Sequence, residues 1–288
     1  MLYANIIRGS QIVFRIAVIG TGAGISKTSC PPTPIAELAG EGFAPELVEP
    51  RLRTFPMTPY DRGLTALAYI DCAIEAEKAG FDAVFINTFG DYGIDEMRSA
   101  TSMVVVGAGE ATMAMSSNIG RRFSIVTIWP PKLNFIYQER LRSTGMDARC
   151  ASIRHVLSDV EVEGLEGAGA AVTSLKDLNA SIIDRVIEQI EKAIHEDGVD
   201  TIILGCTCMA PIWPLVSRRA PVPVLESMRT GYKTVEAMLA LGLKHSYKAY
   251  PKAAPSNLGV IGKLIAGQGN LDLGGDCEVC VIAEEPAD

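Results

Sequence analysis

Long apolar runs and clusters of positive charge are both missing from this sequence. No hydrophobic stretch reaches the length of a membrane-spanning helix. The 26 lysine and arginine residues are scattered, and 34 aspartate and glutamate residues bring the net charge to −8. Because a nucleic-acid-binding surface needs a basic stripe, we expect neither a nucleic acid nor a membrane as a partner. The first twenty residues lack a basic segment followed by a long apolar core, so we predict no secretion signal and a cytoplasmic location.

Histidine is scarce, and the cysteines show no framework spacing. The three histidines, His155, His195 and His245, do not cluster, whereas a structural zinc site usually takes four nitrogen or sulfur ligands. Cys277 and Cys280 have the spacing of half such a site without a partner pair, so we interpret them as reduced thiols and expect no metal. Seven cysteines in a chain of 288 residues without an export signal fit a reducing compartment better than a disulfide framework.

Two common functional signatures are also missing. The chain has no Gly-x-Ser-x-Gly elbow, and no Ser-His-Asp order stands out. The segment "GTGAGISKTS" at 20–29 follows a predicted strand, as a nucleotide-binding loop would. However, Ile25 stands where the dinucleotide fingerprint has its third glycine, and Ser26 stands where a phosphate-binding loop has glycine before lysine. We interpret this segment as a substrate-contacting loop or a plain turn.

The residues that are present alternate between two patterns. Hydrophobic residues make up 48% of the chain, which is ample for a sizeable core. Short apolar runs predict strands, and longer segments with apolar spacing near 3.6 predict helices. Strands are predicted at 14–20, 81–91, the beginning of 102–120, 122–131, 147–156, 199–206 and 220–227, and helices at 63–80, the rest of 102–120, 133–145, 178–198 and 228–242. This alternation predicts an α/β fold with parallel sheets.

The pattern runs twice along the chain. One apolar strand ends in "NTFGD" at 87–91 and another in "GCTCM" at 205–209, each after a long helix. We therefore predict two similar Rossmann-like domains, the first formed by residues 1–118 and 226–288 and the second by residues 119–225. Ligands of open α/β sheets bind beyond the carboxyl ends of the strands, so we expect the site in a cleft where the two turns face each other.

Cys206 is the best-placed candidate for acid/base chemistry. It lies at the carboxyl end of the predicted strand 199–206, directly after a glycine. Backbone N–H groups of the next turn would stabilise a thiolate there and lower its pKa. Cysteine is also a small hydrophobe that often lies in cores, which remains the alternative for Cys206. That is our interpretation of Cys30, Cys72 and Cys150.

Several ordered segments resemble the aspartate/glutamate/hydantoin racemase superfamily, and the hydantoin and allantoin racemase branch is the most similar. They are "NTFGDYGIDEMRSATSMVVVGAGEATMAM", "RRFSIVTIWP" and "TIILGCTCMA". The resemblance covers most of residues 60 to 242. It implies two pseudo-symmetric α/β domains with the site between them, no cofactor, and a homo-oligomer.

The resemblance also implies a mechanism. In that family two cysteines, one from each domain, face opposite sides of an acidic carbon, and one removes a proton while the other returns one. Cys206 falls on the second-domain cysteine, and Thr88 falls on the first. A threonine hydroxyl is roughly five or more pKa units less acidic than a thiol and is a poor base. Two outcomes stay open: racemisation with a hydroxyl or water relaying the proton, or a one-sided reaction by Cys206 alone.

Further residues are implied as substrate contacts. They are Thr21, Asn87, Phe89, Thr127, Trp129, Thr207 and Cys208. The loop "GTGAG", with Thr21 in the middle, replaces the Asn-Pro-Asn turn of the hydantoin type, so the resemblance does not settle hydantoin as the substrate.

We predict a cofactor-independent racemase or epimerase that acts on a carbon acid next to a carbonyl, in an amino acid or a hydantoin-like molecule. Cys206 is the predicted acid/base, with Thr88 opposite. The second interpretation is a single-cysteine decarboxylase or isomerase of a small malonate-like or maleate-like acid. The third is a binding protein that kept the cleft after losing a catalytic thiol; a ligand bound without turnover would indicate it.

Overall fold

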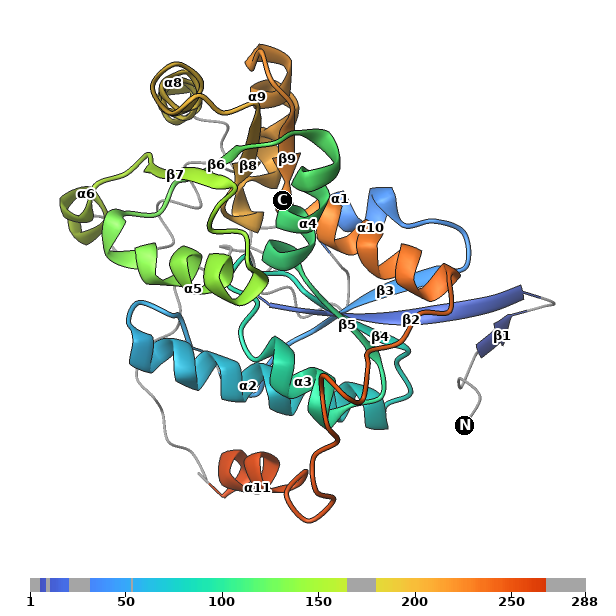
Figure 1. The fold of residues 1–288 in the computed structure, drawn as a ribbon. Coiled ribbons are helices and arrows are strands. Elements are labelled where there is room, and N and C mark those ends of the chain that lie inside the picture. The colour runs from blue at the N-terminus through green and yellow to red at the C-terminus, as the bar shows by residue number, and fades with distance from the viewer. Residues whose placement is uncertain (1–5, 9–10, 21–31, 53, 165–179, 268–288) are drawn as a thin grey trace, which may run out of the picture.

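The fold consists of two β-sheets flanked by helices (Figure 1). The computed structural model describes residues 6–8, 11–20, 32–52, 54–164 and 180–267. The strands are β1 (Ile6–Arg8), β2 (Gln11–Ile19), β3 (Phe43–Val48), β4 (Ala83–Ile86), β5 (Val104–Gly107), β6 (Phe123–Thr127), β7 (Cys150–His155), β8 (Thr201–Leu204) and β9 (Val224–Glu226). The helices are α1 (Thr33–Leu38), α2 (Pro59–Lys78), α3 (Ile94–Ala100), α4 (Ala108–Ile119), η1 (Pro131–Leu133), α5 (Asn134–Thr144), α6 (Asp159–Gly164), α8 (Ala180–Asp197), η2 (Thr207–Ile212), α9 (Trp213–Arg219), α10 (Ser227–Ala240) and α11 (Val260–Ala266).

The two sheets have the same strand order. In the first, β2 lies between β3 and β4, and β5 follows β4; in the second, β6 lies between β7 and β8, and β9 follows β8. All these pairings are parallel, and β1 alone among the described strands runs antiparallel, against the start of β2. The predicted α/β class is thus confirmed, with one antiparallel edge that the sequence pattern did not predict.

Successive side chains of each strand point to opposite faces of the sheet, so they pack against two different layers of helices. In β4, Val84 and Ile86 belong to the cluster that contains α2, while Phe85 packs against Tyr232 of α10, with ring centroids 6.2 Å apart. In β8, Ile203 points toward α5, and its neighbours in the strand join the cluster that contains α8. One cluster runs through both halves, so the two sheets share a continuous core.

The chain crosses between the sheets twice. It leaves the first sheet after α4 and enters the second at β6, and it returns after β9, where α10 packs on β4 and β5. The long helix α2 begins at Pro59, because Thr58 caps it by accepting the N–H of Asp61 at 3.2 Å. This start lies four residues before the predicted one. β3, α1, α3 and α9 were not predicted.

The segment after α10 covers the free edge of β5. His245 Nε2 accepts the N–H of Val105 at 2.8 Å, and Ala253 donates to the carbonyl of Ser99 at 3.2 Å. An exposed edge strand invites pairing with another chain, so this cover protects the first sheet. No helix in the described ranges is both long and apolar enough to span a membrane.

Candidate active site

Two turns at equivalent positions meet between the sheets. After β4, the N–H of Asn87 donates to Ile19 at 2.7 Å; after β8, the N–H of Gly205 donates to Val126 at 2.8 Å. Each bond continues the pairing with the neighbouring central strand, β2 or β6, by one residue. Thr88 and Cys206 are the next residues, so they hold the same place in the two halves.

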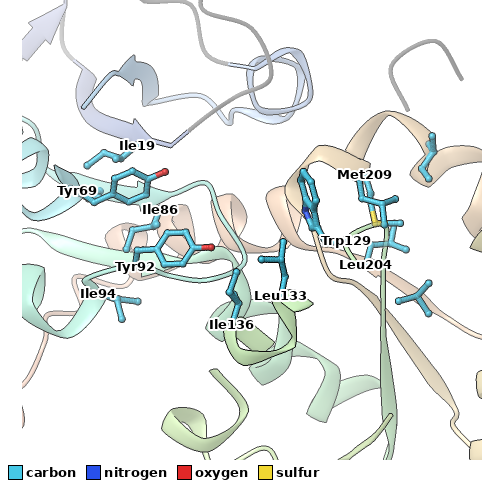
Figure 2. Packing of buried hydrophobic residues seen from close by; sticks show 14 of the residues in the cluster. Ile19, Tyr69, Ile86, Tyr92, Ile94, Trp129, Leu133, Ile136, Leu204 and Met209 are labelled. Atoms are coloured by element: carbon cyan, nitrogen blue, oxygen red, sulfur yellow. The ribbon is translucent and has the colours of Figure 1, made fainter. Parts of the chain in front are cut away.

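A cavity of about 80 Å³ lies between these turns. A cavity needs roughly 10–15 Å³ of such space to hold one water, so this one has room for several waters or one small ligand. Its walls are Thr54, Phe55, Pro56, Tyr69, Thr88, Phe89, Gly90, Tyr92, Trp129, Leu133, Ile136, Tyr137, Gly205, Cys206, Thr207 and Cys208. Six of these are aromatic and none carries a charge at neutral pH. Figure 2 shows Tyr69 and Tyr92 of the first half facing Trp129 and Leu133 of the second.

Cys206 lies in the cavity wall and is half-buried. It opens η2, and its Sγ accepts the N–H of Cys208 at 3.2 Å, the backbone support that the sequence predicts for a thiolate. The structure also joins Cys206 to Cys208 in a disulfide. The expectation of thiols only is therefore wrong at this position, because the turn brings two cysteines together that an extended strand would keep apart.

Thr207 ties the two turns to each other. Its hydroxyl donates to the carbonyl of Asn87 at 3.1 Å, so the turn after β8 is anchored on the turn after β4. Phe89 adds an apolar link, since its ring lies 5.5 Å from that of Tyr137 and belongs to the core of the second half. The Thr207 hydroxyl is thereby used in holding the site together.

An ordered chain of hydrogen bonds lies behind Cys206. The Trp129 N–H donates to Thr127 Oγ1 at 3.2 Å, and Tyr137 donates to the Gly205 carbonyl at 3.1 Å. The Tyr137 proton is committed to that carbonyl, so Thr127 is the donor in the 2.6 Å bond between the two hydroxyls. Thr127 is fully buried and does not line the cavity. The structure thus places this predicted substrate contact underneath the site, where it orients Tyr137.

Gly205 is required by this packing. A Cβ at that position would lie 2.7 Å from Ile125 Cγ2 and 3.1 Å from both Thr127 Cβ and the Tyr137 ring. Any other residue would therefore push the following Cys206 away from the strand end.

The matching residues of the first half, Asn87 and Thr88, have polar side-chain atoms without hydrogen-bond partners among the described residues. Thr88 lines the cavity, but its Oγ1 is buried and has no hydrogen-bond partner among the described residues. The side chain of Asn87 is fully buried, and neither of its polar atoms has a described partner. Asn87 does not line the cavity. Thr21 lies outside the described residues.

Four of the seven predicted contacts, Phe89, Trp129, Thr207 and Cys208, do line the cavity. Phe55, Tyr69, Tyr92 and Tyr137 also line the cavity, and none of them was predicted. Tyr92 stands inside the quoted motif "NTFGDYG", so its position was the available signal. Tyr69 and Tyr137 belong to helices whose apolar spacing predicts core positions only.

The other cysteines are placed away from the cavity. Cys72 is buried in α2 and Cys150 begins β7, and burial raises the pKa of each thiol to about 12. Both groups are neutral at physiological pH, consistent with packing roles. Cys30, Cys277 and Cys280 lie outside the described residues. In the described ranges, no three histidine, cysteine or acidic side chains are grouped as metal ligands.

Comparisons with known proteins identify the family and the fold. Residues 16–235 match the family model described as Asp/Glu/Hydantoin racemase. The hydantoin racemase of Paenarthrobacter aurescens is 32% identical over 189 residues, which are 65% of this chain and 74% of that protein. An allantoin racemase structure from Klebsiella pneumoniae has a TM-score of 0.63 at 27% identity, covering 84% of this chain and 95% of that one. The allantoin racemase of Pseudomonas fluorescens has a TM-score of 0.72 at 24% identity, covering 84% and 98%, and supports the fold.

Proposed function

The chain belongs to the Asp/Glu/hydantoin racemase family and is a racemase, and on this premise we propose that its substrate is a neutral, hydantoin-like ring with an apolar substituent. The reacting centre is the ring carbon that bears the substituent and lies next to a carbonyl. Cys206 is the proposed acid/base on one face of that carbon.

The observation that carries this proposal is the uncharged, aromatic lining of the cavity. A free amino acid would bring a carboxylate and an ammonium group into walls whose described residues offer neither a cation nor an anion. Burying such charges without partners costs several kcal/mol per ion, on the order of the whole stability of a binding complex. A hydantoin ring has no charge at neutral pH, and its apolar substituent would pack against the rings of Phe55 and Trp129, which lie 5.3 Å apart.

The chemistry starts from the Cys206 thiolate. The thiolate removes the proton from the ring carbon, and the electron pair moves to the adjacent carbonyl oxygen as an enolate. The Cys208 N–H, which donates to Cys206 Sγ in the disulfide form, is the proposed support of the thiolate after reduction. This role needs a free thiol, so the disulfide between Cys206 and Cys208 has to be reduced before turnover. The proton on the opposite face comes from the first half, where Thr88 holds the position equivalent to Cys206.

A one-sided decarboxylase is the second candidate, and the Thr88 position favours it. Without a thiol there, an enolate formed by loss of CO₂ would receive its proton from Cys206 alone. A substituted malonate carries two negative charges, however, and the described cavity wall has no cation for either. We therefore rank this reaction below racemisation of a neutral ring.

The test is to incubate the reduced protein with each pure enantiomer of 5-benzylhydantoin and to follow the optical rotation. We expect the optical rotation of both enantiomers to fall to zero, faster than in buffer alone. L-Phenylalanine and phenylmalonate serve as charged comparisons with the same aromatic group. Faster loss of rotation with phenylalanine, or release of CO₂ from phenylmalonate without any change in the hydantoin, would contradict the proposed substrate.

A further inference from the structure

Racemisation by two opposed groups needs an acid/base side chain on each face of the reacting carbon, one to accept a proton and one to donate one, and Thr88 does not present such a group. Its Oγ1 is buried, so the hydroxyl that the sequence places opposite Cys206 does not open into the cavity. Given the proposed function, another side chain of the first half has to supply the second proton.

The hydroxyl of Tyr92 differs from that of Thr88, although Thr88 as a whole is the less buried residue. Its side chain is only 5% exposed and lines the cavity, yet its hydroxyl is not among the buried atoms without a partner. No hydrogen bond holds that hydroxyl within the described part of the chain. Figure 2 shows the ring entering from the first half with its oxygen directed toward the side where Trp129 and Leu133 of the second half lie. The group is thus free to bond to a ligand.

Local sequence fixes this direction. A Cβ at Gly90 would lie 2.3 Å from the Tyr92 ring, so only glycine leaves room for the ring to lie over the turn. Gly93, the next residue, has a positive φ of 73° and begins α3, which turns the chain away from the cavity. On its other side the ring contacts Tyr69 edge-on, with centroids 6.0 Å apart. Tyr92 is therefore held rigidly with its polar end at the cavity.

We propose that Tyr92 is the second catalytic residue, and that its phenol exchanges protons with the face of the substrate carbon opposite Cys206. In one direction the Cys206 thiolate takes the proton from carbon, and the electron pair forms the enolate. The enolate carbon then takes the proton of the Tyr92 O–H on its other face, which leaves a phenolate and a Cys206 thiol. The opposite enantiomer runs the same transfers in reverse, so atoms and charge balance without any co-reactant.

The surroundings of Tyr92 favour its neutral phenol. Burial raises the pKa of Tyr92 well above its ordinary value, so the resting group is a proton donor. Tyr69, Tyr137 and Asp91 raise the pKa of Tyr92 further. The nearby guanidinium of Arg62 acts in the other direction and lowers it in part. Arg62 is itself held by an ion pair with Glu139 of α5, so its charge is fixed between the two halves.

The experiment measures exchange of the ring-carbon proton in D₂O, by proton NMR, for each enantiomer of 5-benzylhydantoin with dithiothreitol present. Tyr92→Phe keeps the ring and removes the hydroxyl, and Thr88→Val removes the hydroxyl of the alternative residue at nearly constant shape. For Tyr92→Phe we expect racemisation to fall by ~10²-fold or more. Exchange should persist for one enantiomer only, with its configuration retained, because Cys206 still serves its own face. Thr88→Val should racemise at close to the wild-type rate.

Retained exchange at one face shows that the Tyr92→Phe protein is folded, so loss of racemisation would not be a folding artefact. If Tyr92→Phe still racemised normally, or if Thr88→Val lost one face in its place, the inference would be overturned while the proposed function stood. Tyr69→Phe, on the same wall, is the matched control. If Tyr69→Phe lost proton exchange at one face of the ring carbon while Tyr92→Phe racemised at the wild-type rate, the role of Tyr92 would also be overturned. No exchange by the wild-type protein would instead contradict the proposed function.

Discussion

The turn after β4 and the turn after β8 hold equivalent places in two sheets of the same strand order, but their reactive groups differ. The second-half turn offers sulfur at the first residue beyond the strand extension, supported by a backbone N–H. The first-half turn has Thr88 there with a buried hydroxyl, and offers a tyrosine four residues later. Strand order therefore determines where a reactive group can stand, whereas the turn sequence decides which residue reaches the cavity.

Removing the second-half thiol should have the largest effect. Because a positioned acid/base typically contributes 10²–10⁴-fold, Cys206→Ala should lower the rate of racemisation of 5-benzylhydantoin by about that factor. Polarimetry under reducing conditions measures the rate. Cys150→Ala is a suitable control, since that thiol is outside the cavity and should leave the rate nearly unchanged. Equal activity of Cys206→Ala and wild type would show that the second-half thiol is not an acid/base group and would contradict the comparison of the two turns.

The oxidation state of Cys206 and Cys208 should control proton transfer by the second-half turn and should not affect the first half. In the disulfide, Cys206 has no thiolate to remove a proton. Racemisation should therefore rise in proportion to the number of free thiols as dithiothreitol is added, measured with a thiol reagent on the same samples. Cys208→Ala, which cannot form this bond, should be active without reductant. A fully oxidised wild-type protein with full activity would contradict this prediction.

The third effect concerns the backbone that carries Cys206. Gly205→Ala places a Cβ 2.7 Å from Ile125 Cγ2, so we expect a loss of about 1–3 kcal/mol in the free energy of unfolding and a lower turnover rate. Urea unfolding and polarimetry report the two quantities. Gly63→Ala, with nothing within 4 Å of the added Cβ and a helical position in α2, should instead stabilise the fold by about 0.5–1 kcal/mol. Similar losses in both variants would argue against the close packing behind Cys206.

The smallest effect compares two buried carboxyl groups. Asp91 accepts N–H groups of Gly109 and Glu110 at the start of α4, and Glu226 accepts those of Met228 and Arg229 at the start of α10. Burial raises the pKa of each to about 7, above the unfolded values near 4. Each folded carboxyl then holds its proton where the unfolded one has lost it. Its contribution to stability is therefore present below about pH 4 and is lost as the pH rises to 7.

Asp91→Asn and Glu226→Gln should remove that pH dependence one group at a time. Between pH 5 and pH 7 the free energy of unfolding of each variant should fall less steeply than that of wild type, by up to about 1.4 kcal/mol per pH unit. Asparagine also tolerates the positive φ of 44° at residue 91. Urea unfolding at several pH values gives the slopes, and a slope identical to wild type in both variants would rule out the raised pKa values.

Much of the architecture follows from sequence periodicity, and the chemistry of the cavity follows less well. Apolar runs such as 199–206 predict buried strands, and the repeated pattern predicts two sheets with their ends facing. Cys206 could be identified because it is the last residue of such a run. Thr127 could not be placed, because hydrogen bonds to Trp129 and Tyr137 turn its hydroxyl into the packing behind the site.

Residues that reach the cavity from helices or distant loops leave no such signal. Tyr69 and Tyr137 have the spacing of ordinary core residues, and Phe55 comes from a loop whose contact with Trp129 depends on how the two halves meet. The disulfide likewise depends on the tight turn at η2, since cysteines two residues apart in a strand would not bond. These features arise from tertiary contacts, which spacing along one chain does not encode.

The most direct test of the account is face-specific deuterium exchange by the reduced Cys206→Ala protein with each pure enantiomer of 5-benzylhydantoin. If each half of the molecule serves one face, this variant should exchange only the enantiomer whose ring-carbon proton faces Tyr92, and should retain its configuration. This exchange should be slow, because the phenolate that acts as the base is the minor form of Tyr92. The other enantiomer should stay protonated apart from the background rate in buffer. Exchange of both enantiomers at wild-type rates, with loss of configuration, would show that Cys206 is not one of two opposed acid/base groups and would contradict the account.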